Sequence, residues 1–213
     1  MTASEALAKG AAPILGRPLT QEERDEFGKY LALLLKWQRA HRFVGSSDPV
    51  WIVEHLFLDS LLFLKLLPAS VRVLADLGSG AGLPGLPIKI VRPDLDVVLI
   101  ESRRRRATFL ASALRAMELK GARVLEGRVE SLMDQIRGRF DAVVMRCAGE
   151  VESMIPIAAD LVSDHGVVIA SGPPKPRPLS AGEWVTVPGL ARGTTRRFAV
   201  YRKRGSSYFP VQK

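Results

Sequence analysis

Short apolar runs alternate with amphipathic stretches over the last two thirds of the chain, a pattern typical of a doubly wound α/β sheet. Five of these runs predict parallel strands, at residues 71–76, 96–101, 123–126, 140–146 and 166–171. Two later runs, at residues 184–187 and 197–202, predict a closing hairpin. We therefore expect an α/β fold with a mostly parallel, seven-stranded sheet.

The chain before this alternation has the period of helices. Thr20 and Glu23 form a capping box, and large apolar residues follow at helical spacing. Asp48 followed by Pro49 marks a second helix start, because proline is favoured at the first helical position. From there the helical pattern continues, with a break, to Leu67.

This change of period divides the chain into a small N-terminal helical extension, residues 1–67, and an α/β domain, residues 68–213. Residues 1–19 are predicted to be a loosely ordered lead. Within the extension, His55 and Asp59 stand four residues apart on one helical face. Two such residues are too few for a metal or acid–base site, so we expect a structural hydrogen bond between them.

A glycine-rich turn follows the first predicted strand, with the sequence Asp76-Leu-Gly78-Ser-Gly80-Ala-Gly82. The dinucleotide fingerprint needs its third glycine at the position of Leu83, so it does not match. An acidic residue followed by alternate glycines resembles the first motif of class I S-adenosylmethionine-dependent methyltransferases. A tight turn without a ligand is the alternative.

Two charged residues end predicted strands at the edge where ligands bind in open α/β sheets. Glu101 closes the second strand, and its carboxylate can accept the ribose hydroxyls of a nucleoside cofactor; the alternative is a solvated strand end. Arg146 closes the fourth strand, where a salt bridge to Asp141 or Glu150 is the alternative to a role in the site.

The chain of 213 residues has a formal net charge of +9, which favours a polyanionic partner such as nucleic acid. Four consecutive arginines open the helix after Glu101. Cations at a helix N-terminus oppose the macrodipole, so phosphate contact is a natural purpose for them, although an ordinary basic helix start is nearly as well supported. The candidate RNA-binding residues are Arg103, Arg104, Arg105 and Arg106.

Composition excludes several other classes. The single cysteine, Cys147, allows no intramolecular disulfide and no cysteine-rich zinc site. No apolar run approaches the roughly 18 residues of a membrane span, and the N-terminus lacks the apolar core of a secretory signal. We therefore expect a cytoplasmic protein that is a monomer, binds no metal and does not enter a membrane.

The residues after the fourth strand bear on the methyl acceptor. Met145-Arg146-Cys147-Ala148 stands where exocyclic-amine methyltransferases carry an Asp/Asn-Pro-Pro-aromatic motif. Cys147 lies in an Arg-Cys-Ala context, which disfavours a cytosine-C5 nucleophile. The sequence shows no Lys-Asp-Lys-Glu tetrad of the kind that would indicate a ribose methyltransferase.

The chain from about Trp37 to Ala148 resembles the small-subunit ribosomal RNA guanine-N7 methyltransferases, also known as the glucose-inhibited division protein B family. The most specific part is residues 76–87, where the glycine turn continues as Leu-Pro-Gly-Leu-Pro, followed by Ile-Val-Arg-Pro at 90–93. Further matches occur in order at residues 58–60, 101–102, 105–106, 109–110, 128–130 and 140–146.

The resemblance implies a Rossmann-like methyltransferase domain, S-adenosylmethionine as cofactor and 16S ribosomal RNA in the small subunit as partner. It implies a catalytic or orienting role for Arg146, and no general base, because guanine N7 carries a free lone pair. Together with the acidic glycine turn, the predicted cofactor-binding residues are Asp76, Gly78, Gly80, Gly82, Leu83, Glu101, Val129, Glu130 and Arg146.

The chain departs from the family pattern mainly on the acceptor side. Arg42–Gly45 replaces an Asn-Leu-Thr segment, Met145-Arg146-Cys147 replaces Ser-Arg-Ala, and Ser171-Gly172 replaces Lys-Gly. His55 lies four residues before Asp59, whereas the family histidine lies three residues before the corresponding aspartate. Two alternatives therefore stay open: a divergent methyltransferase acting on another RNA or a small molecule, and a non-catalytic RNA-binding assembly protein.

Overall fold

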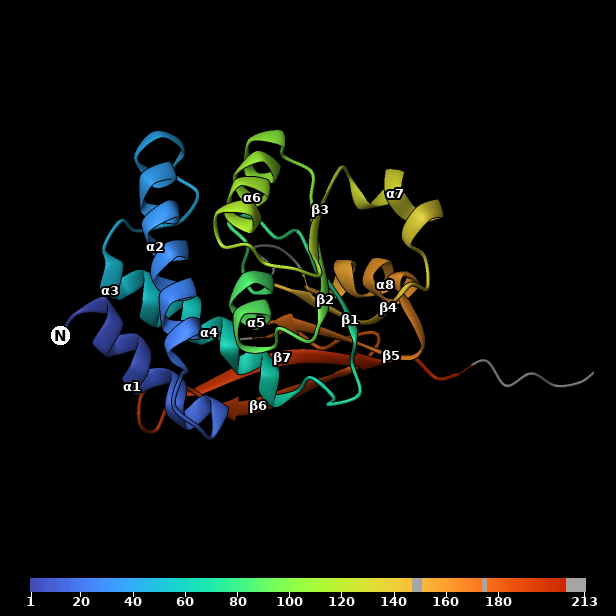
Figure 1. Ribbon diagram of the computed structural model, residues 1–213. Coiled ribbons are helices and arrows are strands. Elements are labelled where there is room, and N and C mark those ends of the chain that lie inside the picture. The colour runs from blue at the N-terminus through green and yellow to red at the C-terminus, as the bar shows by residue number, and fades with distance from the viewer. Residues whose placement is uncertain (147–150, 174–175, 206–213) are drawn as a thin grey trace, which may run out of the picture.

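A computed structural model describes residues 1–146, 151–173 and 176–205. Within these residues the centre is a seven-stranded sheet in the order β3-β2-β1-β4-β5-β7-β6 (Figure 1). The first five strands are parallel, and β7 runs antiparallel between β5 and β6. The predicted sheet is confirmed, with strands β1 (Val73–Leu77), β2 (Asp96–Glu101), β3 (Ala122–Glu126), β4 (Phe140–Met145), β5 (Val162–Ser171), β6 (Glu183–Pro188) and β7 (Thr195–Arg202).

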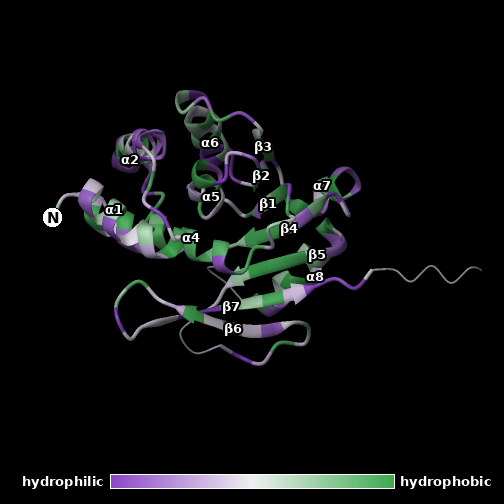
Figure 2. Cartoon of the chain, turned by 60° about the horizontal axis from the view of Figure 1, so that its bottom comes forward, coloured by the Kyte–Doolittle hydropathy of each residue, from purple (hydrophilic) through white to green (hydrophobic). Residues whose placement is uncertain are grey.

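Helices cover both faces of the sheet because successive strand residues point to opposite sides. In β1, Leu74 packs in one hydrophobic core, whereas Ala75 and Leu77 pack in the other. Figure 2 shows the inner strands β4 and β5 as hydrophobic, with α5 and α6 above them. The first face is covered by α5 (Gly85–Val91), α6 (Arg104–Ala116) and the N-terminal helices, and the second by α7 (Val129–Ile136) and α8 (Val151–Leu161).

The predicted helix starts of the N-terminal region are confirmed. Helix α2 (Gln21–His41) begins at the capping box, where the Thr20 hydroxyl accepts the Glu23 N–H and the Glu23 carboxylate accepts the Thr20 N–H. Asp48 caps the second segment by accepting the Val50 N–H. That segment changes its helical type along its length, through α3 (Pro49–Ile52), the π turn η1 (Val53–Phe57), α4 (Leu58–Leu61) and the 3-10 turn η2 (Leu62–Lys65).

The prediction of a loosely ordered lead was wrong. Residues Ala3–Leu15 form helix α1, which begins with its own capping box between Thr2 and Glu5. Its buried side chains are small apart from Leu7 and Ile14, so the segment has little of the large apolar periodicity that marks α2. Burial against η1 and α4 holds this helix in place, because an isolated helix of this length is marginal in water.

The N-terminal helices share one hydrophobic core with the first face of the sheet. The fully buried rings of Tyr30 and Phe57 stack with their centroids 4.7 Å apart, and Phe27 lies against Phe57 at 5.6 Å. Residues 1–67 therefore pack as a layer of the α/β domain, with no separate core.

Two helix glycines test whether α1 is docked. A Cβ at Gly10 would overlap the buried Leu58 side chain, whereas a Cβ at Gly28 in α2 would meet nothing. Gly10→Ala should lower the free energy of unfolding by about 1–3 kcal/mol through overpacking. Gly28→Ala should raise it by up to about 1 kcal/mol through helix propensity. Urea unfolding measures both; a stabilising Gly10→Ala would contradict the docking of α1.

Candidate functional site

The candidate site lies at the carboxyl ends of the parallel strands, where β1 sits between β2 and β4. The glycine turn leaves β1 there and leads into α5. Gly78, Gly80 and Gly82 have φ angles of 74°, 59° and 94°, in the left-handed region that favours glycine. The backbone thus turns sharply at the edge of the sheet where ligands bind in folds of this kind.

Two buried carboxylates hold the turn by accepting backbone N–H groups. Asp76 accepts from Gly85 at 2.9 Å, and one oxygen of Glu101 accepts from Gly80 at 2.8 Å. The other Glu101 oxygen accepts from the Arg103 N–H at 2.7 Å, which ties the end of β2 to the start of α6. Glu101 is only 4% exposed, so the alternative of a solvated strand end was wrong.

The N-terminal helices also hold the turn through a hydrogen bond. The buried hydroxyl of Tyr30 in α2 donates to the carbonyl oxygen of Ala81 at 2.6 Å. On the opposite side, the N–H groups of Gly78 and Ser79 donate to the Ile100 carbonyl at 2.9 and 3.1 Å. The turn is therefore held from the neighbouring strand and from a helix 51 residues earlier in the chain.

Glycine is required at different positions of the turn for different structural reasons. A Cβ at Gly82 would overlap Leu86, and one at Gly85 would lie 2.7 Å from an Asp76 carboxylate oxygen, so these positions serve close packing. A Cβ at Gly78 would meet no atom within 4 Å. Gly78 is the position where the backbone faces open space.

Gly78 lines a hollow of about 200 Å³ at the strand ends. Two of the predicted cofactor residues, Val129 and Glu130 at the start of α7, line the same hollow. The predicted cofactor residues do not include the other lining residues, although most of these directly flank a predicted position. They are Leu77, Ile100, Ser102, Gly127, Arg128 and Met154.

Two predicted cofactor residues lie behind the turn. The Asp76 side chain is fully buried, and burial raises its pKa to about 7 against the opposing effect of the Gly85 N–H. Leu83 is 7% exposed within the core shared with the N-terminal helices, and its N–H donates to the Ser79 carbonyl. Both residues shape the turn, and their contact with a cofactor stays a prediction.

Arg146 follows β4 and is held by the N-terminal helices. Its guanidinium donates to the His55 carbonyl at 2.7 Å and lies 3.3 Å from the Asp59 carboxylate. Arg196 in β7 lies on the same carboxylate, with N···O distances of 2.7 and 3.0 Å. Burial lowers the pKa of Arg146 from its ordinary value, and the Asp59 charge opposes that effect. Asp59 thus joins three distant parts of the chain.

This network corrects two expectations. The Asp59 carboxylate forms ion pairs with Arg146 and Arg196, and the His55 Nδ1 lies 3.1 Å from the Trp51 carbonyl oxygen. The prediction of a His55–Asp59 hydrogen bond was therefore wrong. Asp141, an expected partner of Arg146, accepts the backbone N–H groups of Arg72 and Val73. Cys147, Ala148 and the other expected partner, Glu150, lie outside the described residues.

The four arginines occupy the start of α6, beside the glycine turn. Arg103, Arg104 and Arg105 are exposed, whereas Arg106 is half-buried, with its Nη1 3.7 Å from a Cβ built at Gly80. The Glu101 carboxylate at the helix start partly offsets their unfavourable interaction with the macrodipole. Their role in RNA binding stays a prediction.

Among the described residues, no group of three or more His, Cys, Asp and Glu side chains could hold a metal ion. No helix in the same part of the chain has the length and apolar character needed to cross a bilayer.

Comparison with known families matches residues 23–172 to GidB, described as rRNA small subunit methyltransferase G. The chain belongs to this family. A ribosomal RNA small subunit methyltransferase G from Sorangium cellulosum is 37% identical over 190 residues, which cover 87% of this chain and 79% of that protein. One from Xanthomonas oryzae pv. oryzae is 37% identical over 142 residues, covering 67% of this chain and 65% of that protein.

Solved structures agree on the fold. The Escherichia coli protein yhhF, assigned as a methyltransferase, superposes with a TM-score of 0.51 at 20% identity, over 70% of this chain and 85% of that one. The seven-stranded, mostly parallel sheet is that of the Rossmann-like class I methyltransferases, as predicted.

The buried carboxylate in this fold predicts an unusual pH dependence of stability. With a folded pKa near 7 and an unfolded value near 3.8, Asp76 binds more protons in the folded state, so stability falls as pH rises between these values. Between about pH 5 and 8 the wild type should lose roughly 2–3 kcal/mol more unfolding free energy than Asp76→Asn, which cannot ionise.

Urea unfolding at the two pH values measures the difference. Asp94→Asn is the control, since the Arg92 guanidinium holds the pKa of Asp94 below its usual range and outside this window. Equal pH dependence in wild type and Asp76→Asn would contradict the buried, proton-binding carboxylate.

Proposed function

We propose that this methyltransferase uses S-adenosylmethionine to methylate N7 of a guanine in 16S ribosomal RNA. Membership of the rRNA small subunit methyltransferase G family supports the enzyme class and the ribosomal substrate. The observation that carries the proposal is the glycine turn, in which Gly78 opens onto a hollow at the carboxyl edge of the sheet, the same edge at which Arg146 follows β4. We further propose that the enzyme acts as a cytoplasmic monomer without a metal.

The residues around the hollow fit this cofactor. Leu77, Ile100, Val129 and Met154 offer apolar side chains to a flat adenine ring, and Gly78 lets a ligand approach the backbone. Glu101 uses each carboxylate oxygen for one N–H, and each oxygen keeps a second lone pair for a ribose hydroxyl. Gly80, Gly82, Leu83 and Asp76 would then set the shape of the turn, and Glu130 would border the cofactor.

Methylation at N7 places modest demands on the protein. S-adenosylmethionine supplies an electrophilic methyl group on a positively charged sulfur. Guanine N7 has a lone pair and no proton to lose, so the site needs no general base. The work of the chain is then alignment and electrostatic fit. This agrees with a hollow whose lining, among the described residues, includes two charged side chains, those of Arg128 and Glu130.

Arg146 is proposed to orient the base or the cofactor, since arginine can donate to the O6 edge of guanine and leave N7 open. Its bond to the His55 carbonyl and its approach to Asp59 fix its position at the strand end. Arg103, Arg104 and Arg105, exposed at the start of α6, are proposed to contact RNA phosphates. Arg106 stands closer to the turn, beside Gly80.

Cofactor binding is tested with a pair of glycines that differ only in location. Gly78 and Gly193 have φ angles of 74° and 78°, and a Cβ at either meets no atom within 4 Å. Alanine at each should lower the unfolding free energy by a similar amount, roughly 1–2 kcal/mol. In calorimetry, only Gly78→Ala should weaken S-adenosylmethionine binding, by about tenfold or more. Equal affinities in the two variants would reject the hollow as the cofactor site.

The product is tested by mass spectrometry of nucleosides from unmethylated small ribosomal subunits incubated with enzyme and cofactor. N7-methylguanosine should form, and Arg146→Lys should reduce its rate by about 100-fold, because lysine cannot reproduce the directional bonds of the guanidinium. Arg137→Lys, in an exposed pair with Asp160, is the control and should leave the rate unchanged.

Other products separate the remaining functions. Methyl transfer to another base or to ribose would overturn the guanine-N7 assignment and leave the fold untouched. Tight cofactor binding without transfer to any ribosomal RNA would favour a divergent substrate or a non-catalytic assembly role.

A further inference from the structure

Next to Arg146 the surface carries a pair of stacked rings. The Trp51 and His55 rings lie 4.7 Å apart and nearly parallel, at 9°. Trp51 is half-buried and His55 is exposed, and no other ring contact of His55 occurs within the described residues. The carbonyl of His55 is the one that accepts from Arg146. The residue with the exposed ring therefore also holds the proposed catalytic arginine through its backbone carbonyl.

A basic hollow adjoins the rings on the side of α2. It measures about 400 Å³ and is lined by Arg39, Arg42 and the loop at residues 44–47, together with Gln38. The Gln38 amide holds that loop by donating to the Val44 carbonyl and accepting the Val44 N–H. A Cβ at Gly45 would lie 3.8 Å from the Trp51 ring, so the hollow and the ring pair are contiguous.

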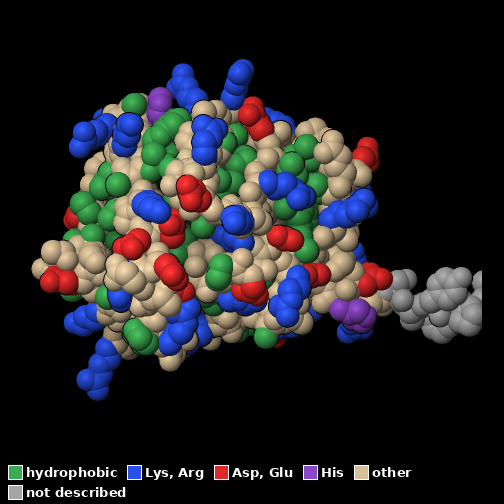
Figure 3. Space-filling model, viewed as in Figure 1, with side chains coloured by type: hydrophobic (Ala, Val, Ile, Leu, Met, Phe, Trp, Pro, Cys, Tyr) green, Lys and Arg blue, Asp and Glu red, His purple; other side chains and the backbone are tan. Residues whose placement is uncertain are grey.

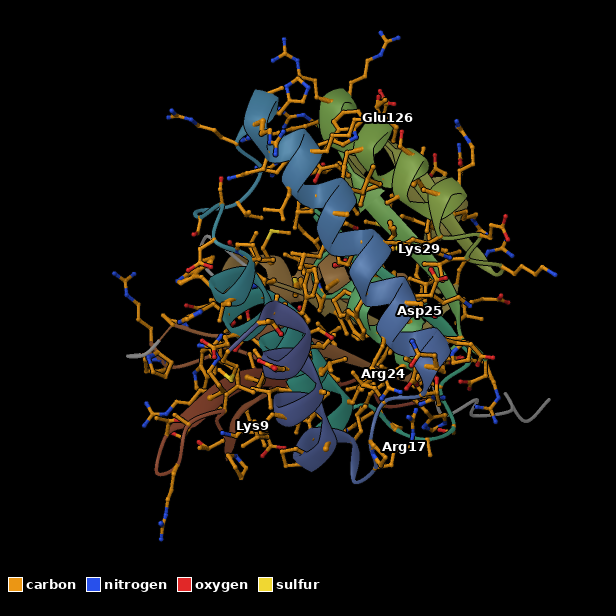
Figure 4. All side chains as sticks on the ribbon, turned by 60° about the vertical axis from the view of Figure 1, so that its left-hand side comes forward. Lys9, Arg17, Arg24, Asp25, Lys29 and Glu126 are labelled. Carbon is orange, nitrogen blue, oxygen red and sulfur yellow. The ribbon has the colours of Figure 1, made fainter. Side chains whose placement is uncertain are left out.

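The two arginines of this hollow are available for a partner. Both are exposed, and neither forms an ion pair within the described part of the chain. Figure 4 shows long nitrogen-tipped side chains extending from this end of α2, and Figure 3 shows blue side chains along the same edge. The end of α2 and the loop after it also pack on the middle of α6, where the rings of Trp37 and Phe43 lie 5.6 and 5.3 Å from that of Phe109.

We propose that Trp51, His55, Arg39 and Arg42 form an aromatic–basic strip that binds a single-stranded segment of the RNA substrate. The rings would stack on one unpaired base, and the arginines would contact the phosphates that follow it. A duplex has no unstacked base to offer such a ring, and the charge of the strip excludes a cationic partner. This inference rests on the proposed function and assigns the path by which RNA reaches Arg146.

The strip is tested by fluorescence anisotropy with a labelled single-stranded RNA of about 16 nucleotides and with a duplex of the same length. His55→Ala removes an exposed ring and leaves the backbone carbonyl for Arg146, so the fold should be preserved. It should weaken single-strand binding by about tenfold. His55→Phe should restore most of the affinity, and duplex binding should change little in either variant. Trp51→Leu should act in the same direction as His55→Ala.

The arginines are tested through salt. Arg39→Gln/Arg42→Gln should lower the slope of log affinity against log salt by about 1.4, as expected for two contacts to single-stranded phosphates. Arg115→Gln/Lys120→Gln removes the same charge at the far end of α6, where both side chains are exposed, and is the matched control. Cofactor affinity measured by calorimetry should stay constant in all these variants.

Three results would overturn the strip: no single-strand binding by the wild type, unchanged affinity in His55→Ala and Trp51→Leu, or equal salt slopes in the two double variants. Equal losses for duplex and single strand would point to charge alone and reject base stacking. Because anisotropy requires no turnover, failure of the strip with N7-methylguanosine still formed would leave the proposed function standing. If the wild type bound single-stranded RNA as expected but formed no N7-methylguanosine, the strip would stand and the proposed function would fail.

Discussion

The glycine turn must satisfy its buried backbone N–H groups, and much of the structure follows from how it does so. Asp76 takes the Gly85 N–H, Glu101 takes that of Gly80, and the Ile100 carbonyl takes two more. These partners pull the turn against β2 and leave Gly78 facing the hollow. The carboxylates that the sequence associates with a cofactor are therefore also the groups that shape the turn at the proposed site.

The N-terminal helices are part of this arrangement. Tyr30 bonds to the glycine turn, and the His55 carbonyl and the Asp59 carboxylate hold Arg146. Burial raises the pKa of Tyr30 well above its ordinary value, which keeps the hydroxyl as a donor. A helical layer that covers one face of the sheet thus also orders the ligand edge, and changes in its packing are expected to reach the site.

The charged side chains divide into buried groups that hold the structure and exposed groups that face solvent. Asp76 is buried where ionisation is costly, and its packing role does not require a charge. Asp59 is buried between two arginines, which compensate its charge and leave Arg146 in one position. The arginines of the α6 start and of the α2 end stay largely exposed, as a surface that meets polyanions would require.

The sequence by itself determined the sheet and the position of the glycine turn within it. Strand periodicity predicted every strand to within a few residues, and the spacing of Asp76, the glycines and Glu101 predicted the turn and the candidate ligand edge, because such signals are local. It missed α1, in which two of the four buried residues are alanines, although Thr2 and Glu5 already form a capping box.

Only the tertiary structure decided the partners. Arg146 follows β4, Asp59 lies on α4 and Arg196 lies on β7, and nothing in their spacing indicates that they meet. The bond from Tyr30 to Ala81 likewise spans 51 residues. The difference between Gly78, which faces a hollow, and Gly82, which faces Leu86, also comes from packing. Contacts of this kind depend on how whole layers dock, whereas strand periods and turn motifs depend on neighbours along the chain.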